Sequence, residues 1–192
     1  MKVGITGTIG SGKTMVSDYL RSKDIDVFDC DAYNAELLKN NKEVLNKILQ
    51  VFPECVDHLV INKTKLAEIV FNDDNKRLKL ESIMHPYIFD KMNEISKSTD
   101  LFVAEVPLLF ETNLDSYFDV TILVVTNSNI AHERLLDKGY SLEQVKNREL
   151  KQLPVENKMK RATEIIYNNG SFVDLYKEID KLLLKYDWQW LI

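Results

Sequence analysis

Short, nearly continuous apolar stretches recur along the chain, separated by segments with apolar residues at helical spacing. Two long stretches lie at 101–106 (LFVAEV) and 119–125 (DVTILVV), and shorter ones stand at 3–5, 25–31 (IDVFDCD) and 164–167 (EIIY). Near-continuous apolar strands are typical of a parallel sheet that is covered on both faces. Strands that alternate with helices therefore predict an α/β fold with a doubly wound, parallel, five-stranded sheet.

Helical spacing dominates the long segment between the second and third predicted strands. Leu45, Ile48, Leu49 and Phe52 recur at this spacing, and the pattern continues to about residue 96. A crossover between parallel strands needs only a dozen or more residues. Residues 34–96, approximately, are therefore expected to form an inserted helical lobe that covers the substrate.

A second helical region follows the fourth predicted strand. Residues 129–138 favour a helix that ends before Gly139, and Ser141 with Gln144 forms a capping box for the next helix. Ser171 with Asp174 predicts another helix start after the last strand. Residues 129–161, approximately, are expected to be a helical lid.

Composition sets broad limits on what the chain does. Its 192 residues are 45% hydrophobic and 29% charged, as in a single globular domain, with no linker or repeat. No apolar stretch approaches the roughly 20 residues that span a bilayer, and the first residues lack a signal-peptide core. A cytoplasmic enzyme with no membrane partner and with reduced Cys30 and Cys55 is the default. The net charge of -5 argues against a nucleic-acid partner.

The most informative motif follows the first predicted strand at once. Gly7, Gly12, Lys13 and Thr14 complete the pattern G-x-x-x-x-G-K-[ST] of a phosphate-binding loop, or P-loop. Glycines let the backbone come close to phosphate oxygens, the lysine reaches the β- and γ-phosphates, and the threonine hydroxyl can bind Mg²⁺. The fold class is therefore a P-loop NTPase-type sheet.

The rest of the chain narrows the choice among P-loop proteins. The N-K-x-D and D-x-x-G motifs typical of a GTPase are absent. Asp29 and Asp31 are two residues apart, so in an extended strand they point to the same side. A carboxylate there could accept the proton of an acceptor hydroxyl, as in kinases. The alternative is that both end the strand in solvent.

Positive charge gathers on the predicted lid. It carries Arg134, Lys138, Arg148, Lys158 and Arg161. Mobile cations that close over a transferring phosphoryl group stabilise its charge and exclude water. Arg134 and Arg148 are the favoured candidates, and Arg148 is expected to share one helix face with Gln152, four residues on.

Several motifs in order resemble the dephospho-CoA kinase family over nearly the whole chain. They are GTIGSGKT, VFDCD, KLAEIVF, MHP at 84–86, VPLLFE at 106–111, Arg148 with Gln152, and IIYNNGS. Members of that family transfer the ATP γ-phosphate to the ribose 3′-hydroxyl of dephospho-coenzyme A. The resemblance thus implies ATP with Mg²⁺ as cofactors and dephospho-CoA as substrate.

The resemblance also implies roles for particular residues. ATP phosphates would lie on Gly10, Ser11, Gly12, Lys13, Thr14 and Met15. Asp31 would be the base, and Asn168 would lie near the adenine. The acceptor would contact His85, Pro107, Leu108, Leu109, Phe110 and Glu111. His85 before Pro86 is equally compatible with a helix start, because proline suits the first turn.

Some positions depart from the family pattern. Glu105 stands where aspartate is usual, and Lys138 replaces a lid arginine in a segment that is one residue shorter. Lysine lacks the bidentate fork of arginine. Lys63, Thr163 and Tyr167 also differ. Two other functions stay open from the residues alone: another small-molecule or nucleoside P-loop kinase, or a nucleotide-binding regulatory module. The oligomeric state is left open.

Overall fold

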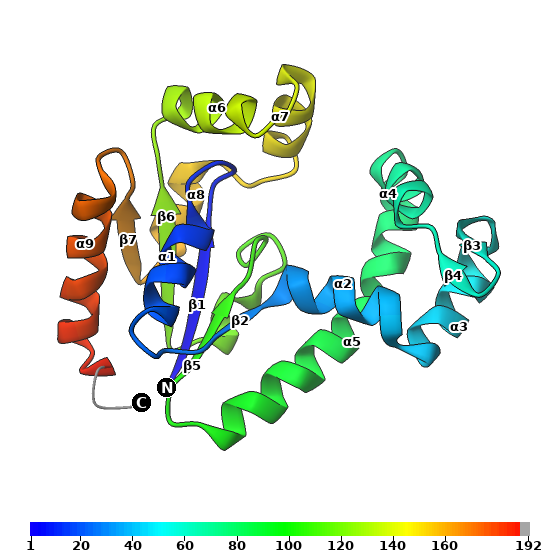
Figure 1. The fold of residues 1–192 in the computed structure, drawn as a ribbon, viewed down its shortest axis with the longest axis horizontal. Coiled ribbons are helices and arrows are strands. Elements are labelled where there is room, and N and C mark those ends of the chain that lie inside the picture. Colours follow the sequence, from blue (N-terminus) through cyan, green and yellow to red (C-terminus); the bar gives the residue numbers. More distant parts are fainter. Residues whose placement is uncertain (189–192) are drawn as a thin grey trace. The chain divides into compact units, whose positions relative to one another are not determined.

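The computed structural model describes residues 1–188 and divides into two compact units (Figure 1). The first unit combines Met1–Asp29 with the chain from Ser98 onward, and the second unit comprises Cys30–Lys97. Each unit has a hydrophobic core of its own. The inserted helical lobe expected at 34–96 falls within the second unit.

Five parallel strands form the sheet of the first unit, in the order β2-β5-β1-β6-β7. These strands are β1 (Lys2–Gly7), β2 (Val27–Asp29), β5 (Phe102–Glu105), β6 (Val120–Val125) and β7 (Glu164–Tyr167). They coincide with the five predicted apolar stretches, so the predicted α/β class with a five-stranded parallel sheet is confirmed. The carboxyl ends of β1, β5 and β6 meet at one edge, where ligands of open α/β sheets bind.

One face of the sheet is covered by α1 (Lys13–Arg21) and α9 (Phe172–Lys185), which pack beside each other. Successive strand residues point to opposite faces, and the alternate residues Val3 and Ile5 of β1 are fully buried on this side. The same cluster holds, from the two helices, Val16, Leu20, Leu175, Ile179, Leu182 and Leu183. This packing fixes the start of α1 against the end of β1.

The opposite face receives the segment that follows β5. Gly4 of β1 has no Cβ, and one placed there would lie 2.6 Å from Leu109 and 2.8 Å from Phe118. The 3₁₀ helix η2 (Leu114–Tyr117) belongs to this segment, and α8 (Val155–Arg161) contacts β6. The small residue in β1 therefore lets the segment after β5 approach the sheet closely.

Two further helices lie between β6 and α8 in the chain. They are α6 (Ser128–Asp137), which ends just before Gly139, and α7 (Leu142–Glu149). Ser141 and Gln144 form the predicted capping box at the start of α7, with N···O distances of 2.9 and 3.2 Å. Ser171 and Asp174 form the second predicted capping box at the start of α9.

The second unit is mainly helical. It contains α2 (Cys30–Asn40), α3 (Lys42–Val51), η1 (Pro53–Cys55), the hairpin strands β3 (Val56–Asp57) and β4 (Val60–Ile61), α4 (Lys63–Phe71) and most of α5 (Asp74–Ser98). Its buried cluster includes Ile48 and Phe52 of the predicted helical pattern, with Leu45 packed against it, whereas Leu49 is exposed. The antiparallel hairpin was not predicted.

Three local predictions were wrong. The second strand ends at Asp29, and Asp31 lies in the first turn of α2, so these residues do not alternate along one extended strand. His85 and Pro86 lie inside α5 rather than at a helix start. Gln152 lies beyond the end of α7 and so does not share a helix face with Arg148.

Each error has a local physical cause. The strand pattern cannot show where β2 stops, because Cys30 begins a helix after only three paired residues. Proline favours a first turn, but a long packed helix tolerates the missing N–H at its interior. Cys30 and Cys55 form no disulfide among the described residues, which agrees with the predicted reduced thiols, and both are buried. Within residues 1–188, no helix combines the length and hydropathy that a membrane span needs.

Candidate active site

The turn between β1 and α1 has the backbone shape that its glycines allow. Gly10 and Gly12 have φ values of 72° and 89°, in the left-handed region that glycine adopts without strain. A Cβ on Gly12 would lie only 2.4 Å from the side-chain nitrogen of Asn168. The turn leads directly into Lys13 and Thr14 at the start of α1. The amides and dipole of a helix start favour a bound anion.

Two hydroxyl groups in this turn are buried without a hydrogen-bond partner among the described residues. They belong to Thr8 and Ser11. Buried polar groups in proteins are nearly always paired, and a hydroxyl can donate to a phosphate oxygen. The phosphate-binding residues predicted from sequence thus include side-chain polar groups that a bound triphosphate would satisfy.

A buried carboxylate contacts the first two turns of α1. Glu105, at the carboxyl end of β5, accepts a hydrogen bond of 2.7 Å from the Ser17 hydroxyl, and its other oxygen lies 3.5 Å from the Thr14 hydroxyl. Only 7% of Glu105 is exposed. Mg²⁺ in kinases is commonly held by few carboxylates together with substrate phosphates. Thr14 and Glu105 fit such a site.

Asn168 joins the last strand to the phosphate-binding turn. Its side-chain nitrogen donates 2.8 Å to the Ser11 carbonyl, and its own carbonyl accepts 2.7 Å from the Thr126 hydroxyl. The side chain is nearly fully buried. Asn168 therefore stabilises the turn directly, and its predicted position near adenine stays a prediction.

The segment 106–113, here the 106–113 loop, follows Glu105 and has no regular structure. Its position is fixed at its start, where the Val106 N–H donates 2.8 Å to the Ile5 carbonyl and the Thr6 hydroxyl donates 3.2 Å to the Pro107 carbonyl. Leu109 and Phe110 are fully buried, whereas Pro107 and Leu108 are half-buried. A substrate contact by Leu109 or Phe110 is therefore limited to main-chain atoms as the loop stands.

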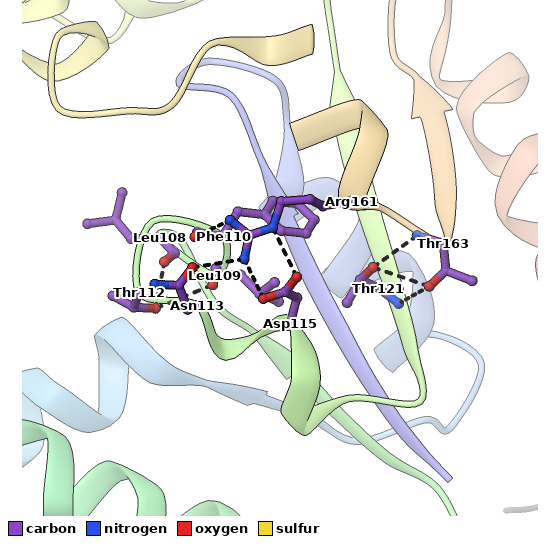
Figure 2. Close-up of polar contacts among 9 residues, drawn as sticks. All are labelled: Leu108, Leu109, Phe110, Thr112, Asn113, Asp115, Thr121, Arg161 and Thr163. Carbon is purple, nitrogen blue, oxygen red and sulfur yellow. Dashed lines mark hydrogen bonds and ion pairs between the residues drawn. The ribbon is translucent and has the colours of Figure 1, made fainter. Parts of the chain in front are cut away.

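Charged side chains from α8 hold the same loop (Figure 2). Arg161 donates 2.9 Å to the Phe110 carbonyl, 3.1 Å to the Asn113 side chain, and 2.5 and 3.0 Å to the two oxygens of Asp115. Hydrogen bonds from Arg161 lower the pKa of Asp115 below its ordinary value, against an opposing effect of burial. The Arg161 guanidinium also lies over the Phe110 ring.

Glu111 of the same loop is bound by Leu153 and Lys158. Its Oε1 accepts 2.9 Å from the Leu153 N–H and lies 2.7 Å from the ammonium of Lys158, which is fully buried. Lys158 and Glu111 thus form an ion pair. The Lys158 ammonium nitrogen and Glu111 Oε2 are buried without a hydrogen-bond partner among the described residues. Lys158 and Arg161 thus bind the 106–113 loop and the adjoining Asp115, whereas the sequence suggested mobile lid cations.

The remaining cations have different surroundings. Arg134, on α6, has one guanidinium nitrogen that is buried without a partner in the described part of the chain. The Arg148 guanidinium lies 4.8 Å from the centre of the Tyr140 ring. Lys138 follows the last residue of α6. The catalytic role of Arg134 and Arg148 stays a prediction.

A comparison with protein families decides between the kinds of P-loop protein. The family model for dephospho-CoA kinase matches residues 1–174. The chain belongs to the dephospho-CoA kinase family. This family consists of ATP-dependent transferases that act in the final step of coenzyme A biosynthesis, so the nucleoside-kinase and regulatory-module alternatives are not favoured.

Two named dephospho-CoA kinases and one further crystal structure are similar to the chain. The enzyme of Bacillus cereus is 34% identical over 189 residues, which cover 94% of each chain. A crystal structure of a protein from Thermus thermophilus has a TM-score of 0.86 at 35% identity and covers 96% of this chain and 97% of its own. Dephospho-CoA kinase from Campylobacter jejuni has a TM-score of 0.64 at 26% identity, with 96% of each chain covered.

Two of the predicted site residues lie in the second unit. Asp31 is exposed in the first turn of α2, and His85 is half-buried in α5. Their roles as base and as substrate contact stay predictions. Within residues 1–188, no cluster of three or more His, Cys, Asp or Glu side chains could hold a metal ion by itself.

Sequence reasoning missed Ser17 and Asp115, and it named Gln152 and Arg161 without predicting the contacts that they make. Ser17 is fully buried on α1 beside Val16, and a polar residue at an apolar position of the helix was its only signal. Gln152 accepts a hydrogen bond of 3.1 Å from the Ile9 N–H of the phosphate-binding turn. Arg161 and its partner Asp115 had no distinguishing local pattern, because their contact joins residues 46 positions apart.

Proposed function

We propose that the protein transfers the γ-phosphate of Mg-ATP to the ribose 3′-hydroxyl of dephospho-CoA and releases CoA and ADP. The observation that supports it most is the phosphate-binding turn, with its two unpaired buried hydroxyls, in a chain of the dephospho-CoA kinase family. The reaction forms a bond between the 3′ oxygen and the γ-phosphorus and breaks the bond to the β–γ bridging oxygen, which leaves with ADP.

Residues at the start of α1 would bind the donor. Gly10 to Met15 surround the phosphates, and Lys13 contacts the β- and γ-phosphates. Thr14 and Glu105 would hold Mg²⁺, Glu105 by its oxygen that faces Thr14. When bound there, Mg²⁺ would neutralise negative charge that develops on the transferring phosphoryl group. Glu105 is longer than the aspartate that is usual at this position, and the 2.7 Å hydrogen bond from the Ser17 hydroxyl would orient its carboxylate toward Mg²⁺.

Asp31 would receive the proton of the 3′-hydroxyl. It follows Asp29 by two residues, and Asp29 is paired in register with Glu105 across the β2–β5 ladder. A carboxylate that accepts this proton raises the nucleophilicity of the oxygen and helps to orient it. In the first unit, the acceptor would contact the half-buried residues Pro107, Leu108 and Glu111 of the 106–113 loop. The family resemblance also makes His85, in the second unit, an acceptor contact.

Arg134 and Arg148 would supply positive charge to the transferring group. Arg134 has one guanidinium nitrogen that is buried without a hydrogen-bond partner among the described residues, and the Arg148 guanidinium lies over the Tyr140 ring. Such donors stabilise charge best where water is excluded. Both lie on helices of the predicted lid, α6 and α7.

A single assay with three acceptors tests the proposal. Purified protein with Mg-ATP is supplied with dephospho-CoA, with a mixture of nucleosides, or with no acceptor, and ADP release is followed. Release that depends on dephospho-CoA supports the proposal. Release that depends on nucleosides, release without any acceptor, or no release at all would contradict it.

A further inference from the structure

Residues 152–161, here the brace, join the 106–113 loop to the phosphate-binding turn. Gln152 contacts the turn through the Ile9 N–H. Leu153 and Lys158 both bind Glu111. Arg161 binds the end of the loop, as Figure 2 shows. One short segment therefore contacts both loops that the proposed reaction brings together.

The Arg161 contacts determine the shape of the loop. Asn113 has a φ of 55°, an uncommon conformation for a residue other than glycine. Arg161 binds the Asn113 side chain, the Phe110 carbonyl and both oxygens of Asp115 at once. The planar, five-donor guanidinium can make these bonds together, and a lysine ammonium cannot reproduce that geometry.

We propose that Arg161 is a positioning residue for the acceptor side of the reaction, supported by the buried Lys158–Glu111 pair. This inference rests on the proposed function. Arg161 acts through the 106–113 loop, so its loss displaces the acceptor without changing the donor site. Misplacement of reacting groups by about 1 Å can cost on the order of 10²-fold in rate.

The test compares Arg161→Lys and Arg161→Ala with the wild-type protein. We expect kcat/KM for dephospho-CoA to fall by about 10- to 100-fold in both variants, while the KM for ATP changes by less than about twofold. Guanidinium ion at tens of millimolar is expected to restore part of the activity of Arg161→Ala only, because it replaces the missing fork. A purely structural loss would lower the apparent kcat only in proportion to the folded fraction, would leave both KM values unchanged, and would not respond to guanidinium.

A matched control removes a similar ion pair elsewhere. Lys185 of α9 lies 2.5 Å from Glu164 of β7, the same distance as the shortest Arg161–Asp115 contact. Lys185→Ala should leave both KM values unchanged. Asp115→Asn, which keeps the side-chain size, should reproduce a weaker form of the Arg161 effect if Arg161→Ala does not fold.

The outcomes separate this inference from the proposed function. Wild-type protein that releases no ADP with dephospho-CoA refutes both. If the wild-type protein is active, three results each overturn the positioning role: an unchanged kcat/KM for dephospho-CoA in Arg161→Lys and Asp115→Asn, a KM for ATP that rises by about 10-fold or more, or the same fall in kcat/KM for dephospho-CoA in Lys185→Ala.

Discussion

The Lys158–Glu111 pair should behave as a buried ion pair when one partner is removed. Lys158 is fully buried and only 12% of the Glu111 side chain is exposed. At 2.7 Å and an effective dielectric constant near 20, the gross attraction is about 6 kcal/mol, most of which offsets the cost of removing both charges from water. Loss of one partner leaves the other charge buried, which costs about 3–5 kcal/mol.

Single and double variants measure this effect. Lys158→Met and Glu111→Gln should each lower the free energy of unfolding by about 3 kcal/mol or more, which corresponds to a fall in Tm of about 6–12 °C for a chain of this size. The double variant should lose at least about 2 kcal/mol less than the sum of the two, because no unpaired charge remains. Urea denaturation monitored by circular dichroism gives all three values.

An exposed pair of the same residue types is the control. Lys181 and Glu178 lie 2.5 Å apart on α9, with 69% and 45% of their side chains exposed. Lys181→Met should change the free energy of unfolding by less than about 1 kcal/mol. If Lys158→Met costs no more than Lys181→Met, or if the Lys158 and Glu111 effects simply add, the brace does not depend on a buried charge pair.

Other substitutions test the catalytic site and its support. Asp31→Asn should lower kcat by roughly 10²-fold or more with little change in the KM for ATP, because a positioned proton acceptor is lost; an unchanged kcat would exclude Asp31 as the base. Ser17→Ala removes the 2.7 Å bond to Glu105, so calorimetry should show weaker Mg-ADP binding but unchanged binding of ADP without Mg²⁺, and equal losses would contradict the orienting role. The pKa of Asp115 is lowered mainly by hydrogen bonds from Arg161, so its contribution to stability is present above its unfolded pKa of about 3.9 and is lost as the pH falls through its folded value. The stability difference between wild type and Asp115→Asn should therefore shrink below about pH 4 in urea titrations, and a difference that is constant with pH would refute this linkage.

The sequence predicted the parts of the fold that depend on local pattern. Apolar stretches gave the five strands, because buried parallel strands tolerate few polar residues. The phosphate-binding turn was recognisable because only glycine readily adopts the φ values of Gly10 and Gly12. Capping boxes at Ser141 and Ser171 marked two helix starts correctly.

Features that depend on unusual backbone conformations, or on contacts between residues far apart in the sequence, could not be predicted. The β3–β4 hairpin turns at His58 and Leu59, which have φ values of 46° and 62°. Tight hairpin turns with two such residues usually contain asparagine or glycine, so this one had no sequence signal. Pro86 is exposed inside α5, whereas its neighbours Met84, Tyr87 and Ile88 belong to or pack against the buried cluster. The preference of proline for a first turn therefore did not locate the helix start.

The same difference holds for the candidate site: its residues in local motifs could be predicted, and its residues with distant partners could not. Lys13, Thr14 and Glu105 belong to motifs at the ends of strands, where α/β sheets bind ligands. Lys158 and Arg161 looked like lid cations in the sequence, because helical periodicity cannot distinguish an exposed cation from one paired with a distant carboxylate. Their partners Glu111 and Asp115 became evident only from the three-dimensional contacts.

Analysis of the reaction products directly tests whether the protein phosphorylates the ribose 3′-hydroxyl of dephospho-CoA. Wild-type protein is incubated with Mg-ATP and dephospho-CoA, and the acceptor is recovered and examined by mass spectrometry and ³¹P NMR. We expect the acceptor to gain one phosphoryl group, as a new phosphomonoester on the ribose 3′ oxygen, and one phosphorylated acceptor to form for each ADP released. ADP formed without any phosphorylated acceptor, or a phosphoryl group at another position, would contradict it.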